Sequence, residues 1–283
     1  MITSMGNAQI RQIMALKKKP RERSRTDLFL VEGPKMFREV PGGHLVKVYM
    51  SDSFYKKAGS SFLEKAGSVE VVSDEVFGAM SDTKTPQGVL CLVRQFHYRE
   101  EELLVSPGPG SGLTGVGRKG DVPLVMALEN LQDPGNLGTI MRTAEGAGVT
   151  GILLSRDCVD IYNPKVIRST MGSVYRVPFL YTDDLRSVLR NWKNKGLALF
   201  AAHLKGTCAY DREDYAKPAV FLIGNVSQGL TEETASLADH YIRIPMLGQV
   251  ESLNAAVASA ILMYEAARQR RNRIPVMTGD SKQ

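Results

Sequence analysis

The sequence predicts an α/β protein with a small N-terminal α/β domain and a larger C-terminal domain built on a mostly parallel sheet. Apolar runs alternate with helix-like stretches, and a Gly- and Pro-rich segment at 106–121 interrupts the alternation. We therefore expect an N-terminal domain at 1–100, a linker at 101–122 and a C-terminal domain at 123–283. A hydrophobic content of 43%, without an apolar run of membrane-spanning length, is typical of a globular protein with no membrane segment.

The N-terminal domain is expected to start with a helix. Ser4 or Asn7 can cap it, because short polar side chains accept hydrogen bonds from the first helical N–H groups. Ile10, Ile13 and Met14 follow at the i, i+3, i+4 spacing of one apolar helix face. Short apolar runs that predict strands then follow, with helical stretches between them, at 29–31, 45–50, 69–72 and 88–93.

The C-terminal domain alternates more regularly. Apolar runs that predict buried strands lie at 123–128, 151–154, 197–202 and 219–223. Helix-like stretches lie at 138–147, 164–171, 183–195 and 252–270. Such alternation predicts a mostly parallel sheet that is covered by helices on both faces.

Positive charge is concentrated near the N-terminus. Residues 11–25 hold seven basic residues and one acidic residue, so their net charge of +6 equals that of the whole chain. A focused basic segment indicates a polyanionic partner, and a solvated helix face is the alternative. The candidate RNA contacts in this segment are Arg11, Lys17, Lys18, Lys19, Arg21, Arg23 and Arg25.

The cysteines indicate a compartment rather than a site. Cys91, Cys158 and Cys208 lie far apart in the sequence, which fits neither a metal site nor a redox pair. Isolated thiols are typical of a reducing compartment, so we expect a cytoplasmic protein without a bound metal.

Three polar segments follow predicted strands, where parallel sheets place their ligands. The first, at 129–144, has Asn136 in a turn and Arg142 about one helical turn further on. The second, at 221–230, carries glycines that let backbone approach a ligand closely. The third, at 242–255, includes Ser252, which we expect to cap the last helix. A GxGxxG match at 115–120 is rejected because it precedes a strand instead of opening a helix.

In order and spacing, these segments resemble the three signature motifs of the SpoU (TrmH-like) RNA ribose 2′-O-methyltransferases of the SPOUT superfamily. The N-terminal part resembles that family's substrate-binding domain, which is similar to small ribosomal proteins. The residues that carry this second resemblance are Ser4, Asn7, Ile10, Arg11, Phe29 to Gly33, Ser81 to Thr83 and Pro86 to Gly88. The resemblance implies a deep trefoil knot in the C-terminal domain, bound S-adenosylmethionine and a homodimer. The N-terminal domain would then bind the RNA substrate through the basic segment, and the Gly- and Pro-rich linker would let it swing toward the site.

The resemblance further implies the roles of single residues. Arg142 would be the central catalytic residue, with Asn136, Ser252 and Asn254 shaping the site. A guanidinium keeps its proton in proteins, so we expect Arg142 to hold an RNA phosphate and stabilise the ribose oxygen rather than act as a base. The cofactor would contact Gly224, Asn225, Ile244, Met246 and Leu253, and further RNA contacts would come from Lys165 and Arg168.

The second motif departs from the family pattern. Gly-Asn/Ser-Glu-Gly is usual, but Val226 and Ser227 follow Asn225 in this chain. The leading expectation is an S-adenosylmethionine-dependent methyltransferase of ribosomal RNA, since a separate N-terminal domain is more typical of the ribosomal group. The alternatives are a transfer RNA 2′-O-methyltransferase, a catalytically silent RNA-binding or ribosome-assembly factor, and an unrelated nucleotide-dependent enzyme.

Overall fold

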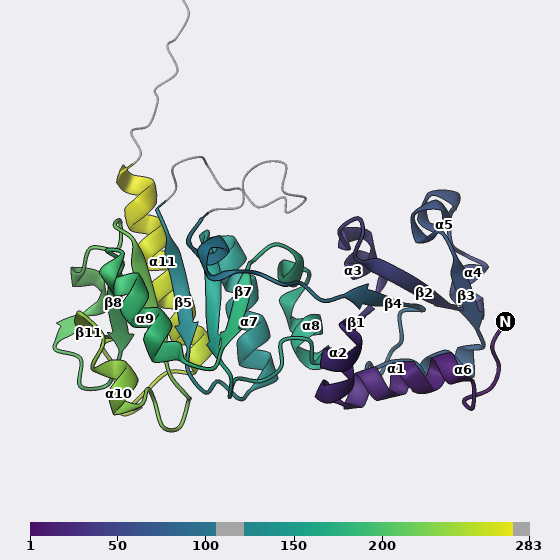
Figure 1. The fold of residues 1–283 in the computed structure, drawn as a ribbon, viewed down its shortest axis with the longest axis horizontal. Coiled ribbons are helices and arrows are strands. Elements are labelled where there is room, and N and C mark those ends of the chain that lie inside the picture. Colours follow the sequence, from purple (N-terminus) through teal and green to yellow (C-terminus); the bar gives the residue numbers. More distant parts are fainter. Residues whose placement is uncertain (106–121, 274–283) are drawn as a thin grey trace, which may run out of the picture.

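A four-stranded mixed sheet forms the centre of the N-terminal domain in the computed structural model, which describes residues 1–105 and 122–273 (Figure 1). Its strand order is β1-β4-β2-β3, in which only β2 and β3 pair in parallel. The elements are α1 (Ala8–Lys18), α2 (Pro20–Thr26), β1 (Leu28–Glu32), α3 (Pro34–Glu39), β2 (Leu45–Ser51), α4 (Asp52–Tyr55), α5 (Ser60–Ala66), β3 (Val69–Val72), α6 (Asp74–Met80) and β4 (Val89–Arg94).

The first helix forms as its sequence predicts. Asn7 rather than Ser4 caps it, because the Asn7 side chain accepts a hydrogen bond from the Gln9 N–H at 2.9 Å. Ile10 and Ile13 are fully buried among β1, β2 and α6 in one apolar cluster. The opposite face of α1 leaves Arg11 in solvent.

The C-terminal domain is built on a seven-stranded sheet in the order β7-β6-β5-β10-β8-β11-β9, and every pairing in it is parallel. The predicted fold class is therefore confirmed, while the knot stays an expectation. The elements are β5 (Leu124–Leu128), α7 (Pro134–Ala147), β6 (Gly151–Ser155), α8 (Pro164–Thr170), η2 (Ser173–Tyr175), β7 (Phe179–Thr182), α9 (Leu185–Asn194), β8 (Ala198–Ala202), β9 (Cys208–Ala209), η3 (Tyr210–Arg212), β10 (Ala219–Ile223), α10 (Glu232–Ala235), β11 (His240–Arg243) and α11 (Ala255–Arg273). None of the described helices is both long and apolar enough to cross a membrane.

The apolar pattern of the sequence does not predict two of the short strands. β7 and β9 lie at the two edges of the sheet, and both have partly exposed residues. An edge strand needs no continuous apolar run, so hydrophobicity alone does not reveal it. The helix expected from residue 138 begins earlier, at Pro134, because Asp133 caps it and proline suits the first helical position.

Part of the expected linker is ordered against the C-terminal sheet. Residues Glu100–Leu104 form a 3₁₀ helix, η1. The Leu103 carbonyl accepts a hydrogen bond from Thr150 Oγ1 at 2.7 Å, and Trp192 Nε1 donates to Glu100 Oε1 at 2.7 Å. The Gly- and Pro-rich stretch at 106–121 lies outside the described residues.

The two domains pack directly on each other. The Phe29 and Tyr162 rings lie 4.6 Å apart between centroids, and Tyr162 Oη donates to the Phe96 carbonyl at 3.1 Å. Tyr175 Oη likewise donates to the Met36 carbonyl, at 3.3 Å. One buried apolar cluster runs through both domains. In place of the expected swinging domain, the structure shows one with a packed, specific orientation.

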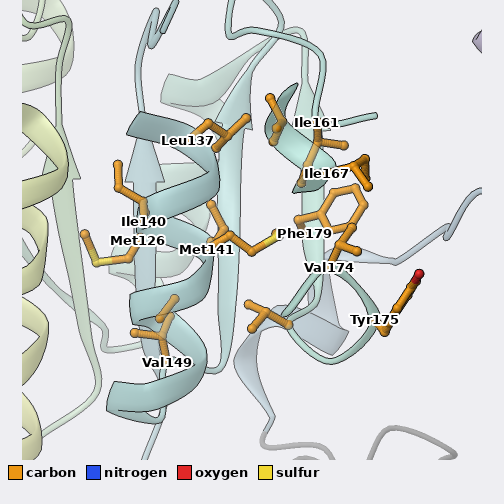
Figure 2. Packing of buried hydrophobic residues seen from close by; sticks show 14 of the residues in the cluster. Met126, Leu137, Ile140, Met141, Val149, Ile161, Ile167, Val174, Tyr175 and Phe179 are labelled. Carbon is orange, nitrogen blue, oxygen red and sulfur yellow. The ribbon is translucent and has the colours of Figure 1, made fainter. Parts of the chain in front are cut away.

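The α7 helix lies at the centre of the C-terminal packing. Figure 2 shows Met141 on the side of α7 that faces Phe179, while Ile140 points to the other side, near Met126. The α7 helix packs so closely against α8 that a Cβ on Gly138 would lie 2.4 Å from Ser169 Cβ. This packing fixes the orientation of the helix that carries Arg142.

Candidate active site

The first motif leaves the sheet at the carboxyl end of β5. Asn130 adopts a left-handed backbone conformation (φ 52°), which asparagine tolerates better than most residues. Leu131 N–H donates to Cys158 Sγ, whose thiol in turn donates to the Leu128 carbonyl, both at 3.3 Å. Burial raises the pKa of Cys158, so this thiol stays protonated and acts as a structural donor.

The α7 helix then presents two of the predicted catalytic residues. The Asp133 carboxylate accepts a hydrogen bond from the Asn136 N–H at 2.7 Å, which holds the first turn of the helix. Arg142 lies further along α7 with its side chain exposed. No hydrogen bond or ion pair joins it to another residue of 1–105 or 122–273, so its guanidinium is available to a ligand.

The third motif meets the first through a side-chain contact. Asn254 Nδ2 donates to Asn136 Oδ1 at 2.9 Å across 118 residues of sequence. Asn254 Oδ1 also accepts from the Ala256 and Val257 N–H groups, at 2.9 and 3.3 Å, and so caps α11. The expectation that Ser252 is this cap is wrong, because the helix begins three residues later, at Ala255. Ser252 itself is exposed on the preceding loop.

The second motif is a tight loop after β10. Asn225 and Gly229 exchange two backbone hydrogen bonds, of 3.0 and 2.8 Å. This closure requires a glycine at 224, since a Cβ there would lie 2.0 Å from the Gly229 carbonyl carbon. Asn225 Nδ2 donates to the Asn130 carbonyl at 2.9 Å, which ties the second motif to the first. Val226 is 48% exposed at the tip, so the departure from the family pattern leaves this framework intact.

Glu129 also belongs to this framework, although the sequence motifs did not predict a role for it. Glu129 directly follows β5, and its carboxylate accepts hydrogen bonds from Thr231 N–H at 2.8 Å and Thr231 Oγ1 at 2.9 Å. It thereby fixes the far end of the second-motif loop. Its position immediately after a buried strand is the sequence feature that could have predicted this role.

The predicted cofactor residues of the third motif lie on the segment between β11 and α11. Ile244, Met246 and Leu253 are half-buried, whereas Leu247 is fully exposed and Val250 is 62% exposed. The start of α11, the second-motif loop and the start of α7 all lie at the carboxyl edge of the sheet, which is the lower edge in Figure 1. The structure thus brings the three motifs to one edge.

The basic segment divides into free and engaged cations. Lys17 donates to the Ala79 carbonyl at 3.5 Å and also to the Ser81 carbonyl, and Arg25 pairs with Glu22 at 2.8 Å. The exposed side chains with no ion-pair partner in the described part of the chain are Arg11, Lys18, Lys19 and Arg21. In Figure 1, α1 and α2 lie toward the same lower edge as the motif loops.

Arg23 is a correction to the predicted RNA contacts. Its side chain is 2% exposed and forms an ion pair of 2.6 Å with Asp160 of the C-terminal domain. Its Nη1 also donates to the Leu16 carbonyl at 2.6 Å. A guanidinium buried and paired in this way joins the domains and is not accessible to a phosphate.

The two basic residues of α8 are both exposed. Arg168 Nη1 lies 3.1 Å from Asp82 Oδ2 of the N-terminal domain, in a pair that is about half exposed on the arginine side. Lys165 has no ion-pair partner among the described residues, so it remains the freer of the two candidate RNA contacts on this helix.

Comparison with known proteins decides the family. Residues 123–264 match the profile of the SpoU rRNA Methylase family, which is half of the chain. The chain belongs to the SpoU rRNA methylase family. Residues 7–91 match the MRM3-like substrate binding domain.

Relatives and solved structures agree with this family. An uncharacterized tRNA/rRNA methyltransferase of Synechocystis is 38% identical over 71% of this chain and 67% of its own length. The 23S rRNA (guanosine(2553)-2′-O)-methyltransferase RlmP of Bacillus subtilis is 29% identical over 93% of this chain and 97% of its own. The structure of an AdoMet-bound rRNA methyltransferase from Sinorhizobium meliloti superimposes with a TM-score of 0.78 at 30% identity, covering 94% of this chain and 97% of that one.

The cofactor that this membership indicates is S-adenosylmethionine, and the residues present fit it. A loop closed over Gly224 leaves backbone groups free of side chains, and half-buried apolar side chains from Ile244, Met246 and Leu253 suit the apolar parts of a nucleoside and a thioether. Within the described ranges, no cluster of three or more His, Cys, Asp or Glu side chains could hold a metal ion.

Proposed function

We propose that the protein transfers a methyl group from S-adenosylmethionine to a ribose 2′-hydroxyl of RNA, and that the RNA is ribosomal. The observation that carries the proposal is the meeting of the first and third motifs through Asn136 and Asn254, with the unpaired Arg142 on the same helix as Asn136. Membership of the SpoU rRNA methylase family supports the reaction type.

Arg142 is the catalytic residue of this proposal. S-adenosylmethionine would supply an activated methyl group on a positively charged sulfur, which leaves as a neutral thioether when the S–CH3 bond breaks and the O–CH3 bond forms, and the hydroxyl proton would pass to water. The chain must then position a ribose hydroxyl and stabilise the negative charge that develops on its oxygen. A guanidinium keeps its charge and offers a planar fork of donors, so Arg142 can hold the adjoining phosphate and stabilise that oxygen.

Asn136, Asn254 and Ser252 shape the site around Arg142. The Asn254 amide is held at both ends, by the α11 backbone and by Asn136, so its orientation is fixed before a substrate arrives. The exposed Ser252 hydroxyl lies two residues before Asn254 and can donate to or accept from the ribose. Gly224, Asn225, Ile244, Met246 and Leu253 form the proposed cofactor contacts.

The RNA would bind along the lower edge in Figure 1, from α1 and α2 to the motif loops. The proposed phosphate contacts are Arg11, Lys17, Lys18, Lys19, Arg21, Arg25, Lys165 and Arg168. Contacts of this kind give an affinity that falls with salt, because each one releases counterions from the RNA. The packed N-terminal domain extends the binding surface beyond one nucleotide, which favours a large structured RNA over a short one.

The proposal includes a homodimer in the cytoplasm. Apolar side chains gather on the third-motif loop and along α11, with Leu247 fully exposed, Val257 49% exposed and Tyr264 53% exposed. A second copy of the chain would cover them, since a monomer gains nothing by exposing such a group. Cys91, Cys158 and Cys208 are free thiols, which supports a reducing compartment.

The test uses the full chain, S-adenosylmethionine labelled in its methyl group and ribosomal RNA transcribed without modifications. We expect label in a 2′-O-methyl nucleoside at one position after digestion. Unmodified transfer RNA serves as the competing substrate, and label in it instead would show that the substrate is transfer RNA and not ribosomal RNA. Cofactor binding without label in either RNA would contradict the proposal and favour a silent RNA-binding factor, the reading that Val226 motivates.

A further inference from the structure

A cavity of about 280 Å³ lies between the N-terminal domain and α8, apart from the candidate active site. One wall comes from β1, β4, α3 and α6, and the other from α8 and the residue that follows it. Its apolar lining includes Leu30, Met36, Met80, Ile167 and Met171. Its volume is close to that of small-ligand sites in proteins.

The walls of this cavity are apolar and include three methionines. Met36 and Met80 are buried, whereas Met171 is 39% exposed at the opening. Methionine side chains are flexible and polarizable, and they pack well against the edges and faces of aromatic rings. These walls therefore suit a flat aromatic ligand better than an extended polar chain.

A half-buried carboxylate, that of Glu32, holds one edge of the cavity in place. Glu32 Oε1 accepts from Ser81 Oγ at 2.6 Å, and Oε2 accepts from the Asp82 N–H at 3.1 Å. Gly33 leaves room for the neighbouring Gln87, since a Cβ there would lie 2.5 Å from Gln87 Oε1. The edge is thus formed before a ligand binds, and the exposed Gln87 amide stands at its mouth.

Three basic residues line the cavity, against the two carboxylates of Glu32 and Asp82. The Lys17 ammonium is held by the Ser81 carbonyl, and Arg168 is held by Asp82 at 3.1 Å. Lys35 is exposed and has no ion-pair partner among the described residues. An apolar interior with a small excess of basic over acidic side chains complements a nucleotide, whose base is flat and whose phosphates are negative.

The α8 helix contacts both the cavity and α7, the candidate catalytic helix. Ile167 and Arg168 line the cavity, whereas Val166 and Ser169 contact Gly138 of α7, about one turn before Arg142. The cavity and α7 thus contact different faces of α8, and a helix with its side chains is about 10 Å across. A ligand that reaches both sites must span a few nucleotides.

We propose that this interdomain cavity receives an unstacked base of the RNA substrate, from a nucleotide that flanks the one to be methylated. The inference rests on the proposed function only in taking RNA as the substrate. Sequence-specific recognition of RNA generally reads bases that are splayed out of a loop, and a base held here would help to select the methylated position.

The test is a binding measurement on the full chain with ¹³C-labelled methionine methyl groups. The probe is a mixed-sequence RNA hexanucleotide, and the matched control is a ribose-phosphate hexamer without bases. We expect the hexanucleotide to shift the Met36, Met80 and Met171 signals while Met126, buried in the C-terminal sheet, stays unchanged. The baseless hexamer should bind the basic segment without moving those three signals.

Two tryptophan variants sharpen the test. Gln87→Trp closes the mouth of the cavity, whereas Thr85→Trp places the same ring on the same exposed loop outside it. We expect Gln87→Trp to weaken binding of the hexanucleotide by about fivefold to a hundredfold, the range measured for one stacked base, and Thr85→Trp to leave it unchanged. The baseless hexamer should bind both variants equally.

Equal shifts with and without bases, or shifts confined to Met246 near the candidate cofactor loops, would overturn the proposal. So would a Gln87→Trp variant that binds the hexanucleotide as tightly as wild type. Because the readout is binding, a protein that passes this test without methylating RNA would contradict the proposed function alone. A protein that methylates RNA and fails this test would contradict the cavity alone.

Discussion

Asn254 and Asn136 join the third motif to the first through a hydrogen bond of 2.9 Å between their side-chain amides. The contact connects the cap of α11 with the first turn of α7, which are 118 residues apart in sequence. It makes the position of the candidate catalytic helix depend on the loop that would hold the cofactor. In the proposed reaction, methyl donor and acceptor would thus be positioned by two connected parts of the chain.

The two functions of Asn254 can be separated by substitution. Asn254→Ser keeps an oxygen that caps α11 but is too short to reach Asn136, so the free energy of unfolding should stay within about 0.5 kcal/mol of wild type. Methyl transfer should fall about tenfold or more, because misplacement of reacting groups is costly. Asn254→Ala should lower both, with a loss of about 1 kcal/mol in unfolding free energy. Urea unfolding and initial rates measure the two effects, and an Asn254→Ser enzyme at the wild-type rate would contradict the role of the contact.

Arg23 and Arg21 lie two residues apart and should respond in opposite ways. Arg23→Ala leaves Asp160 without its partner at the domain junction and should cost about 2 kcal/mol of unfolding free energy. Arg21→Ala removes an exposed charge and should change that free energy by less than about 0.5 kcal/mol.

RNA binding gives the second half of this comparison. Arg21→Ala should weaken RNA binding and reduce the slope of log affinity against log salt by about 0.7 to 0.9 if it contacts one phosphate. Filter binding across a salt series measures both quantities. An Arg21→Ala protein with an unchanged slope would remove Arg21 from the phosphate contacts.

Gly224→Ala should disrupt the second-motif loop. The added Cβ would lie 2.0 Å from the Gly229 carbonyl carbon, so the loop must open and the proposed cofactor contacts must move. We expect cofactor affinity to fall about tenfold or more in calorimetric titration. Gly59→Ala, before α5 in the N-terminal domain, is the matched control, because a Cβ there has no atom within 4 Å and the residue lies outside the motif loops, so its affinity should equal that of wild type. Equal affinities for the two variants would show that the loop does not hold the cofactor.

The acid sensitivity of folding should depend in part on Glu145. Burial alone would raise the pKa of Glu145, but hydrogen bonds from Arg176 and Ser173 outweigh it and hold the pKa below the ordinary value of 4.5. Arg176 also pairs with Glu39 of the N-terminal domain at 2.8 Å. A lowered pKa in the folded state means that ionised Glu145 stabilises the protein above about pH 4.5, and that this contribution is lost as the pH falls through the folded value.

Unfolding measured between pH 6 and pH 3 tests this assignment. The unfolding free energy of wild type should decline with falling pH more steeply than that of Glu145→Gln, which cannot ionise. Parallel declines for the two proteins would show that the carboxylate is not held in its charged form by Arg176.

The sequence predicts much of the fold because its buried strands are continuous apolar runs. The β5, β6, β8 and β10 strands lie where those runs occur. The α1 helix also lies where its apolar spacing and the cap at Asn7 predict it. Edge strands such as β7 lack such a run, and the ordering of η1 depends on distant contacts with Thr150 and Trp192. The local sequence pattern therefore predicts neither the edge strand nor the ordered η1 helix.

The candidate site shows the same division. The sequence places Asn136, Arg142 and Asn254 in their motifs, but only the structure shows that Asn254, and not Ser252, caps α11. Arg23 looks like its basic neighbours in sequence, and its burial follows from the position of Asp160, 137 residues away. Pairing across domains is a property of the tertiary fold, and a charge count cannot reveal it.

The most direct test of the account is the single-turnover rate of methyl transfer to unmodified ribosomal RNA by wild type, Arg142→Ala and Arg190→Ala. Arg190 is exposed on α9, so its substitution removes the same charge away from the motif loops. We expect Arg142→Ala to lose about a hundredfold to a thousandfold in rate with unchanged cofactor affinity, while Arg190→Ala matches wild type. An Arg142→Ala enzyme that methylates RNA at the wild-type rate would contradict the central claim that this guanidinium stabilises the reacting ribose oxygen.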